Sequence, residues 1–320
     1  MYNKGIAVAG VILVDKINEI RAYPNIGELT QIQSVTLATG GCVPNVAMDL
    51  KRLQPSLTVK AGGKVGFDSE GDYAIDQLKN DGVDVSNVVR CENKTSFTEV
   101  MSVVGGQRTF FTYAGANAVF GANDVDLEKL DVDVLHLGYL LLMDKMDNGD
   151  AVVLLQKAKR KGIKTSIDLV SENSDRYSLV LPCLKYTDNL IINEVEACNL
   201  TGIPISKQNL KLMAEKLKSN GVMERVVIHT PELSVCLSND GYVESPSYQI
   251  SPELIKGTTG AGDAFCAGTL LGIYLGLSDQ EILTLASGVA ATSLFSKDAV
   301  SGIKSLSQTQ AFCKTLKLRK

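Results

Sequence analysis

The stretch KGTTGAGDAFCAGTLLGIYLG, residues 256–276, places three small residues directly before an acid and an apolar helical pattern directly after it. Backbone N–H groups at the start of a helix have no partner within the helix, and the helix dipole adds roughly half a positive charge there. Gly260, Ala261 and Gly262 would let an anion approach those N–H groups closely. The stretch therefore predicts an anion hole at a helix start.

An acid beside an anion hole repels the anion unless it serves another group in the reaction. If Asp263 is a general base, it takes a proton from a hydroxyl while that hydroxyl attacks a phosphoryl group held in the hole. The alternative is an ordinary helix start with an acid in its first turn, which is slightly stabilising. The stretch alone leaves both interpretations open.

The composition is typical of a soluble globular protein. Of the 320 residues, 45% are hydrophobic and 21% are charged, and the formal net charge is −4. An acidic balance argues against a nucleic-acid partner, and no apolar run approaches the ~18 residues that a membrane span needs. Seven cysteines without a CxxC pair indicate reduced thiols. We therefore expect a cytoplasmic protein that binds neither nucleic acid nor membrane.

Strand-like apolar runs alternate with helical patterns along the chain. Strands are expected at 4–11, 57–61, 132–137, 165–169, 189–193 and 225–229, and helices at 42–53, 69–81, 150–161, 194–200, 207–220, 261–275 and 279–295. This alternation predicts an α/β fold with a mainly parallel β-sheet flanked by helices. Because no linker interrupts it, we expect a single domain over residues 1–320.

Two segments, 16–39 and 96–113, break this pattern because polar and apolar residues alternate within them. Such alternation is typical of a sheet with one wet face, and Gly105-Gly106 predicts the turn of a β-hairpin. Arg108 fits a solvated hairpin tip better than a contact to a substrate anion. The segments predict a small β-sheet lid inserted in the domain, whose apolar face would consist of Ile17, Ile20, Val35, Val100, Phe110 and Phe111.

Polar residues follow the first predicted strand and the next glycine pair. Asp15 comes directly after the first strand, at the edge where α/β folds bind ligands. Gly40-Gly41 would let a substrate lie against the backbone, and Asn45 on the following helix offers a donor and an acceptor to a hydroxyl. Each of these features alone is weak, and their order along the chain gives them weight.

Other polar residues stand at the ends of later strands. Asn193 and Glu196 could hold Mg²⁺ through its waters, since this ion prefers oxygen ligands. Asp168, at the end of another predicted strand, could contact the substrate or a phosphate, or it could simply be solvated. The sequence leaves both interpretations open. His136 and His229 are the only histidines and fit core or loop positions better than catalytic ones, with His136 the better catalytic candidate.

Taken in order, these stretches resemble the ribokinase-like (PfkB) family of carbohydrate and nucleoside kinases. The resemblance rests on Gly10, Asp15, Gly40-Gly41, Asn45, the AGAN stretch at 114–117, Asn193, Glu196 and the TTGAGD stretch at 258–263, which together span nearly the whole chain. It implies a ribokinase-like fold and an ATP-dependent kinase that phosphorylates a hydroxyl of a sugar or sugar-like molecule, with Mg²⁺ as cofactor.

The resemblance also implies roles for individual residues. Asp263 matches the family's general base, and the three small residues before it match the anion hole. The substrate-binding positions implied are Asp15, Gly40, Gly41, Asn45 and Asn117, the ATP-binding positions are Thr230, Thr258, Gly260 and Gly262, and the metal-binding positions are Asn193 and Glu196. In many members the lid also forms a dimer interface, so a homodimer through the lid is expected.

The chain departs from the family pattern at three places. Gly257 stands where an Asp often helps to bind a monovalent cation, which leaves potassium activation open. Pro231 and Ser234 stand where a Gly-rich loop usually meets the nucleotide, so this loop is expected to have another shape. Leu13 replaces an Asn that is frequent in ribokinases and makes ribose a less favoured substrate.

Three other function classes compete with a sugar kinase. A nucleoside kinase of the same fold would use the same residues. The second class is a non-catalytic sugar-binding relative. The altered loop at Pro231 favours this class, and the intact acid at Asp263 argues against it. An oxidoreductase would need glycines after the first strand, and the sequence at 10–15 is GVILVD. The spaced glycines of GGKVGFDSEG at 62–71 are a lone motif and carry little weight.

Overall fold

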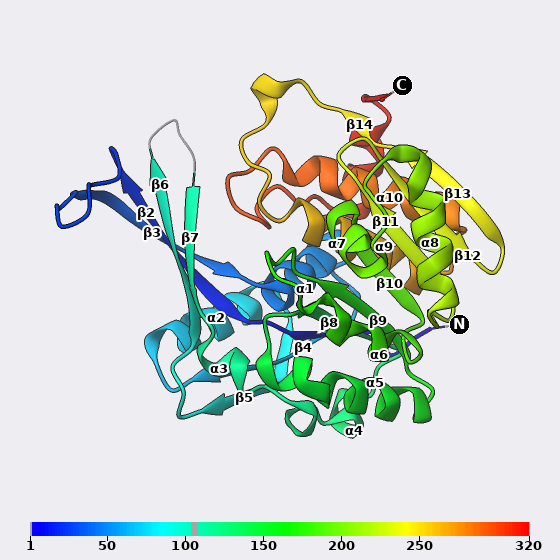
Figure 1. The fold of residues 1–320 in the computed structure, drawn as a ribbon, viewed down its shortest axis with the longest axis horizontal. Helices are drawn as coiled ribbons and strands as arrows, with labels where there is room; N and C mark the ends of the chain where they lie inside the picture. Colours follow the sequence, from blue (N-terminus) through cyan, green and yellow to red (C-terminus); the bar gives the residue numbers. More distant parts are fainter. Residues whose placement is uncertain (1, 104–107, 320) are drawn as a thin grey trace.

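The computed structural model describes residues 2–103 and 108–319. The turn expected at Gly105-Gly106 lies outside these residues. Figure 1 shows a large body built around one sheet, with a second, smaller sheet standing at its side. In the described part of the chain, all seven cysteines are free and no helix has the length and apolarity to span a bilayer.

A main sheet of nine strands runs through the centre of the body, and it is mainly parallel, as the sequence predicts. Its order is β13 (Gly241–Pro246), β12 (Leu233–Ser238), β11 (Arg225–His229), β10 (Asn189–Asn193), β9 (Lys164–Leu169), β8 (Val134–Leu140), β1 (Ile6–Gly10), β4 (Val59–Gly66) and β5 (Asp84–Cys91). All neighbours from β11 to β5 are parallel, whereas β12 and β13 are antiparallel. Continuous apolar runs form the central strands because both faces of a parallel sheet are buried.

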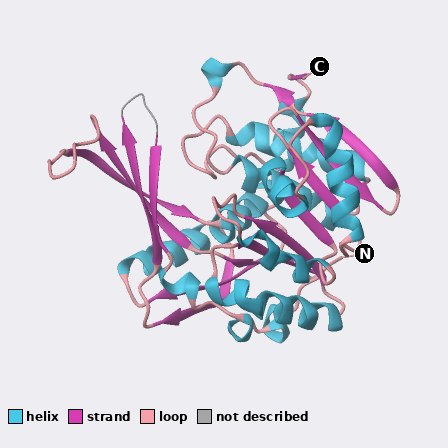
Figure 2. Cartoon of the chain, in the orientation of Figure 1, coloured by secondary structure: helices cyan, strands magenta, loops and turns pink. Residues whose placement is uncertain are grey.

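Helices lie on both sides of the main sheet (Figure 2). They are α1 (Cys42–Leu53), α2 (Ser69–Asn80), α3 (Gly115–Ala118), α4 (Leu127–Leu130), α5 (Ala151–Arg160), α6 (Leu181–Leu184), α7 (Glu194–Thr201), α8 (Leu210–Ser219), α9 (Ala261–Tyr274), α10 (Asp279–Ser293) and α11 (Leu306–Cys313). Those from α1 to α8 stand in the connections between the parallel strands of the main sheet, and α9 to α11 follow its last strand. A two-stranded sheet of β14 (Tyr248–Gln249) and β15 (Lys317–Leu318) lies near the C-terminus.

The sequence patterns locate most elements. One error lies in the bounds of the strand expected at 57–61, and glycines explain it. The strand expected at 57–61 is β4, which begins at Val59 and continues through three glycines to Gly66. Glycines have low strand propensity, yet Gly63 leaves room for Ile12, whose Cδ1 would lie 2.5 Å from a Cβ there. The spaced glycines at 62–66 therefore belong to a strand. Strands β5, β12 and β13 were not predicted.

Both segments expected to form the lid pair with each other in a four-stranded sheet, which we call the small sheet. Its order is β3 (Ile32–Gly40), β2 (Leu13–Ile20), β6 (Ser96–Val103) and β7 (Arg108–Tyr113). The outer pairs are antiparallel, and β2 runs parallel to β6. The small sheet therefore begins within the turn that leaves β1, which places Asp15 at its base.

The single apolar face expected for the small sheet is wrong. Phe110 lies opposite Val100, and Phe111 lies opposite Glu99. Successive residues of a strand point to opposite faces, and opposed residues share a face. The six expected residues therefore divide into one face with Ile17, Val100 and Phe110 and another with Ile20, Val35 and Phe111. Val100 is buried, whereas Val35 and Phe111 are more than half exposed.

The ends of β1 and β8 approach each other closely because both lack a side chain there. Gly10 pairs with Gly138 and has a φ of 139°, a conformation that favours glycine. A Cβ at Gly10 would lie 2.3 Å from the carbonyl oxygen of Gly138 and 2.9 Å from Sγ of Cys42. The two strands and α1 can therefore meet at one point.

Gly10→Ala is expected to destabilise the protein more than Gly241→Ala. Gly241 has a similar φ of 127°, yet no atom lies within 4 Å of its added Cβ, so its substitution costs only backbone strain of about 1–3 kcal/mol. Overpacking at Gly10 should add about 1–3 kcal/mol. Urea denaturation of both variants measures the difference, and equal losses would contradict the close approach.

Candidate active site

The start of α9 faces a cavity at the carboxyl edge of the main sheet. Gly260 precedes the helix in a left-handed conformation with a φ of 78°, and no described side chain caps the first turn, in which the N–H of Ala261 donates to the carbonyl oxygen of Thr258 at 3.3 Å. A cavity of about 180 Å³ opens there, lined among others by Gly260, Gly262 and Asp263. Uncapped N–H groups and the positive end of the helix dipole favour an anion at this position.

Two donors hold the buried carboxylate of Asp263. Its Oδ2 accepts hydrogen bonds from Nδ2 of Asn45 at 2.8 Å and from the hydroxyl of Tyr139 at 2.9 Å. No hydrogen bond from the described residues reaches Oδ1, and Asp263 lines the cavity. Burial raises the pKa of Asp263 to about 7, and the charge of Asp168 adds to this, while the hydrogen bonds and His136 oppose it. These are the properties of a general base.

The residues assigned to the substrate gather where β2, β3 and α1 meet. Asp15 is half-buried, and burial raises its pKa to about 6. A Cβ at Gly40 would lie 2.6 Å from Oδ2 of Asp15, and one at Gly41 would lie 2.5 Å from the carbonyl oxygen of Val11. Oδ1 of Asn45 is buried, and none of the described residues donates a hydrogen bond to it, so this acceptor is left unsatisfied.

Asn117 has a different environment. Its Oδ1 accepts the N–H of Ile12 at 3.2 Å, and its Nδ2 donates to the carbonyl oxygen of Ile12 at 3.0 Å. The side chain is buried. These two bonds hold the turn between β1 and β2, so Asn117 fixes the path of the strand that carries Asp15.

Arg108 crosses from the small sheet to the loop before α9. The side chain is exposed, as expected of a hairpin tip, yet Nη1 donates to the hydroxyl of Thr259 at 3.2 Å. Its positive charge also lowers the pKa of Asp15 against the larger effect of burial. The guanidinium therefore lies between Asp15 and the loop before α9, which the sequence alone did not indicate.

A second cavity adjoins the first at Asn193, His229 and Gly262. It measures about 520 Å³, and Thr230 and Thr258, both assigned to ATP, line it with several apolar side chains, including Ile250, Ile255, Phe265 and Leu294. Its size and walls suit the base and ribose of a nucleotide. A larger cavity of about 720 Å³ between α10, α11 and the C-terminal strands contains none of the predicted site residues.

The loop with the unusual Pro231 is a tight hairpin turn. The hydroxyl of Thr230 accepts the N–H groups of Glu232 and Leu233, and β12 begins at once and pairs with β11. Pro231 lines the 520 Å³ cavity. The residues after β11 therefore form a turn held by the Thr230 side chain, at the wall of this cavity.

Asn193 and Glu196 already satisfy each other. Oδ1 of Asn193 accepts two N–H groups of α7, while Glu196 accepts the N–H and Nδ2 of Asn193 and the hydroxyl of Ser171. Burial raises the pKa of Glu196 to about 8. Both residues line the 180 Å³ cavity. With their polar atoms engaged, the pair fits contact with a hydrated Mg²⁺ through water better than direct coordination.

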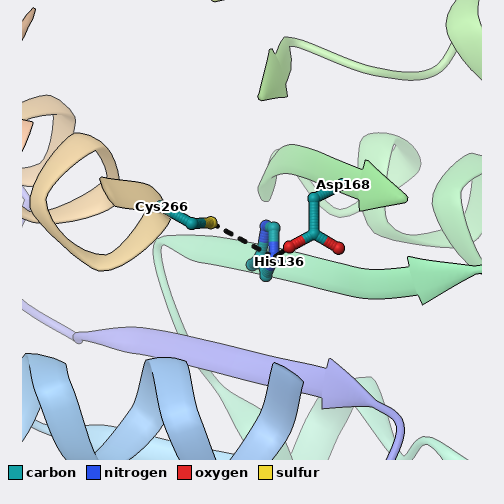
Figure 3. Close-up of side chains that lie close together, drawn as sticks. All are labelled: His136, Asp168 and Cys266. Carbon is teal, nitrogen blue, oxygen red and sulfur yellow. Dashed lines mark hydrogen bonds and ion pairs between the residues drawn. The ribbon is translucent and has the colours of Figure 1, made fainter. Parts of the chain in front are cut away.

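Asp168 belongs to a buried cluster with His136 and Cys266, shown in Figure 3. Nε2 of His136 lies 3.3 Å from Oδ2 of Asp168 and 3.5 Å from Sγ of Cys266. Burial raises the pKa of the Cys266 thiol well above its usual range. The thiol therefore stays protonated, and the cluster is a hydrogen-bonded support behind the cavity. His136 lies in the core, as expected.

His229 and Tyr139 complete the surroundings of Asp263. The ring of His229 packs on Phe265 with centroids 4.7 Å apart, and burial lowers its pKa to about 4, so the imidazole is neutral. Sequence reasoning missed Tyr139 altogether. Its contact with Asp263 depends on a left-handed backbone with a φ of 60°. The local sequence HLGYL, residues 136–140, contains no pattern that predicts this conformation.

Comparison with known proteins places these residues in a family. The model described as pfkB family carbohydrate kinase matches residues 8–306 of the chain. The chain belongs to the PfkB family of carbohydrate kinases. The match covers nearly the whole chain and confirms the resemblance that the TTGAGD stretch suggested.

Relatives of this PfkB-family chain include kinases with different acceptors. It is 28% identical to the ribokinase of Schizosaccharomyces pombe, with 94% of this chain and 95% of that one covered. It is 24% identical to the adenosine kinase of Saccharomyces cerevisiae, with 88% and 85% covered. The structure of Arabidopsis thaliana ribokinase complexed with ribose and ATP has a TM-score of 0.81 at 21% identity and covers 97% of this chain and 98% of that one. The ribokinase-like fold is thus confirmed.

Asp263→Asn is expected to stabilise the protein increasingly as the pH rises. An Asp pKa of about 7 in the folded state, against about 3.9 when unfolded, means that wild-type stability falls as the pH rises through this window. The amide of Asn does not ionise, so the stability of the variant does not fall in this way. Its free energy of unfolding relative to wild type should be about 2 kcal/mol larger at pH 8 than at pH 5.5. Thermal denaturation at both pH values measures this, with Asp240→Asn in an exposed turn as control. A gain that does not depend on pH would contradict the raised pKa.

Proposed function

We propose that this chain is an ATP-dependent kinase that transfers the γ-phosphate to a hydroxyl of a sugar or sugar-like small molecule. The observation that carries the proposal is the buried Asp263 carboxylate, with one oxygen free, at an uncapped helix start where two cavities meet. Residues 1–320 would form one kinase domain, into which the two segments of the small sheet are inserted.

In this mechanism Oδ1 of Asp263 accepts the proton of the attacking hydroxyl. Because Oδ2 is held by Asn45 and Tyr139, the carboxylate keeps a fixed orientation and its free oxygen faces the acceptor. A pKa near 7 gives the carboxylate a useful proton affinity at physiological pH. The hydroxyl oxygen becomes a better nucleophile as it loses its proton, and it would attack the γ-phosphorus in line while the bond from that phosphorus to the bridging oxygen breaks and ADP leaves.

The small residues before Asp263 would stabilise the phosphoryl group during transfer. The backbone N–H groups around Gly260, Ala261 and Gly262 are fixed by the helix, so they need no reorganisation when charge develops. Mg²⁺, held through water by Asn193 and Glu196, would neutralise phosphate charge. ATP would place its base and ribose in the 520 Å³ cavity beside Thr230 and Thr258.

The acceptor molecule would bind between the small sheet and α1. Asp15 and Asn45 would bind its hydroxyl groups, and Gly40-Gly41 would leave its ring close to the backbone. Arg108 and the small sheet would cover it, since Arg108 already contacts the loop before α9. Such closure excludes water, which would otherwise compete as the acceptor.

A nucleoside is the second candidate acceptor. The similarity to an adenosine kinase over most of both chains supports it, and Asp263 would perform the same chemistry on a ribose hydroxyl. Phe110 favours it as well, because this half-exposed ring lies on the same face of the small sheet as Asp15 and could stack on a base. Phosphorylation assays with sugars and nucleosides, each at saturating ATP and Mg²⁺, distinguish the two.

Asp263→Asn and Asp15→Ala are expected to affect different kinetic constants. Loss of the base should lower kcat by about 10²–10⁴ with little change in substrate Kd. Loss of Asp15 should weaken substrate binding by about 1–3 kcal/mol and leave ATP binding nearly unchanged. Steady-state kinetics and calorimetric titration measure both effects. Near-normal kcat in Asp263→Asn would refute the assignment of the base, and equal loss of substrate and ATP binding in Asp15→Ala would refute its assigned role.

We also propose a homodimer formed through the outer face of the small sheet. This face, opposite Asp15, carries four large apolar side chains that are 43–61% exposed, namely Ile32, Val35, Leu37 and Phe111. An exposed apolar patch of this kind is unfavourable in water. A two-fold axis would cover it with the same patch of a second chain.

Val35→Lys is expected to convert the dimer to a monomer, because a lysine at the centre of the patch cannot be buried without a partner. Thr36→Lys is the matched control, since Thr36 is also exposed but points to the other face. Light scattering should give about twice 34.3 kDa for wild type and control and about 34.3 kDa for Val35→Lys. A monomeric wild type would refute the dimer, and a dimeric Val35→Lys would exclude this face.

A further inference from the structure

Tyr139 stands in an unusual backbone conformation next to the catalytic cavity. Two non-glycine residues at the end of β8, Tyr139 and Leu141, have positive φ values of 60° and 82°. Such residues each cost about 1–3 kcal/mol unless their surroundings hold them, and they are concentrated at functional sites. This turn directs the Tyr139 hydroxyl onto Oδ2 of Asp263.

Charged side chains hold this turn at both of its strained residues. Oδ1 of Asp168 accepts the N–H of Tyr139 at 2.6 Å. Oδ1 of Asp147 accepts the N–H of Leu141 at 2.8 Å, and Nη2 of Arg176 donates to the carbonyl oxygen of Leu141 at 2.7 Å. Hydrogen bonds to charged groups are stronger than those between neutral groups, so these three side chains stabilise the strained conformation.

Asp168 is itself fixed from behind. Its other oxygen, Oδ2, lies 3.3 Å from Nε2 of His136, and Nδ1 of that ring lies 3.1 Å from the hydroxyl of Ser166. Figure 3 shows the Asp168 carboxylate beside the His136 ring, with Cys266 of α9 on the other side. All three side chains are buried. A continuous chain of contacts therefore runs from the interior of the sheet to Asp263.

We propose that Tyr139 is a positioning residue for the general base: its hydroxyl, presented by a left-handed turn that Asp168 holds, fixes Oδ2 of Asp263 so that Oδ1 faces the acceptor. Asp168 acts on the base in two opposite ways. Through the Tyr139 N–H it maintains a hydrogen bond that favours the ionised carboxylate, and through its own charge it disfavours that ionisation. The balance of the two sets the pH at which Asp263 becomes a base.

The titratable groups around Asp263 come from several elements. They are Cys42 and Asp49 on α1, His136 and Tyr139 on β8, Asp168 on β9, Glu196 on α7, His229 on β11 and Cys266 on α9. Burial raises the pKa of each of the two thiols, of Asp49, of Tyr139 and of Glu196, and lowers that of His229. Among these groups, Tyr139 donates a hydrogen bond to Asp263, and Asp168 contributes the largest opposing charge.

The test of Tyr139 is the pH profile of kcat/KM, which reports the free enzyme. Tyr139→Phe removes a hydrogen bond to the ionised carboxylate, so the acid limb should move to higher pH by about one unit. The plateau at high pH should fall as well, because Asn45 alone then holds Oδ2 and the carboxylate is less firmly oriented. Tyr186→Phe is the matched control, since this half-buried tyrosine has a hydrogen-bonded hydroxyl away from the site. An acid limb that stays in place in Tyr139→Phe overturns the proposal.

Asp168→Asn provides the opposite shift. The amide oxygen can still accept the N–H of Tyr139, while the negative charge that opposes ionisation of Asp263 is removed. The acid limb should therefore move to lower pH. A shift to higher pH in this variant, or the same direction of shift in both variants, contradicts the balance described here. This variant also keeps the proposal testable if Tyr139→Phe does not fold.

The pH profile of kcat/KM rests on the proposed kinase function. A second test measures stability and needs no activity, so it can succeed or fail independently of that function. The stability difference between Asp263→Asn and its parent levels off at the pKa of Asp263. Thermal denaturation over a pH series measures this difference in the wild-type background and in the Tyr139→Phe background. The pH at which the difference levels off should be higher in the Tyr139→Phe background. If no sugar or nucleoside is phosphorylated but this pH moves, the kinase proposal fails and the positioning role stands. If it does not move, the positioning role fails.

Discussion

Burial of one carboxylate, that of Asp263, is the constraint on which the site depends. Taking a charged carboxylate out of water is costly unless hydrogen bonds compensate for the lost hydration. Here the compensation comes from Asn45 and Tyr139, which are 218 and 124 residues away along the chain. The carboxylate can therefore ionise near neutral pH only if α1, β8 and α9 keep their relative positions.

Missing side chains make that arrangement possible. Gly10 and Gly138 are register partners at the ends of β1 and β8. A Cβ at Gly138 would lie 2.6 Å from Sγ of Cys42 and 3.0 Å from Oδ1 of Asp168. Without these glycines the first turn of α1 could not approach the sheet, and Asn45, one turn further along, could not reach Asp263. Packing and electrostatics are thus linked at this point: the close contact of the backbones determines which donors surround the base.

The two halves of the cleft have different roles in specificity. The main sheet and α9 carry the candidate base Asp263, the uncapped helix start beside it and the 520 Å³ cavity proposed for ATP. The small sheet carries Asp15, Arg108 and Phe110 on the face that looks towards that site. Relatives of this chain include a ribokinase and an adenosine kinase, which shows that one fold can serve different acceptors.

The sequence by itself determined the α/β fold, most of its longer helices and its central parallel strands, and it pointed to the candidate anion hole and the candidate base, because each depends on residues close together along the chain. Helix α1 and strands β10 and β11 have the predicted bounds. Only the tertiary structure decided that Tyr139 bonds Asp263, that Arg108 reaches Thr259, that Asn193 and Glu196 satisfy each other, and that the apolar residues of the small sheet divide between two faces. The physical reason is the separation of the residues along the chain. Periodicity and turn chemistry are set by neighbouring residues, whereas these contacts depend on strand order, register and backbone angles, which residues far apart in the sequence determine together.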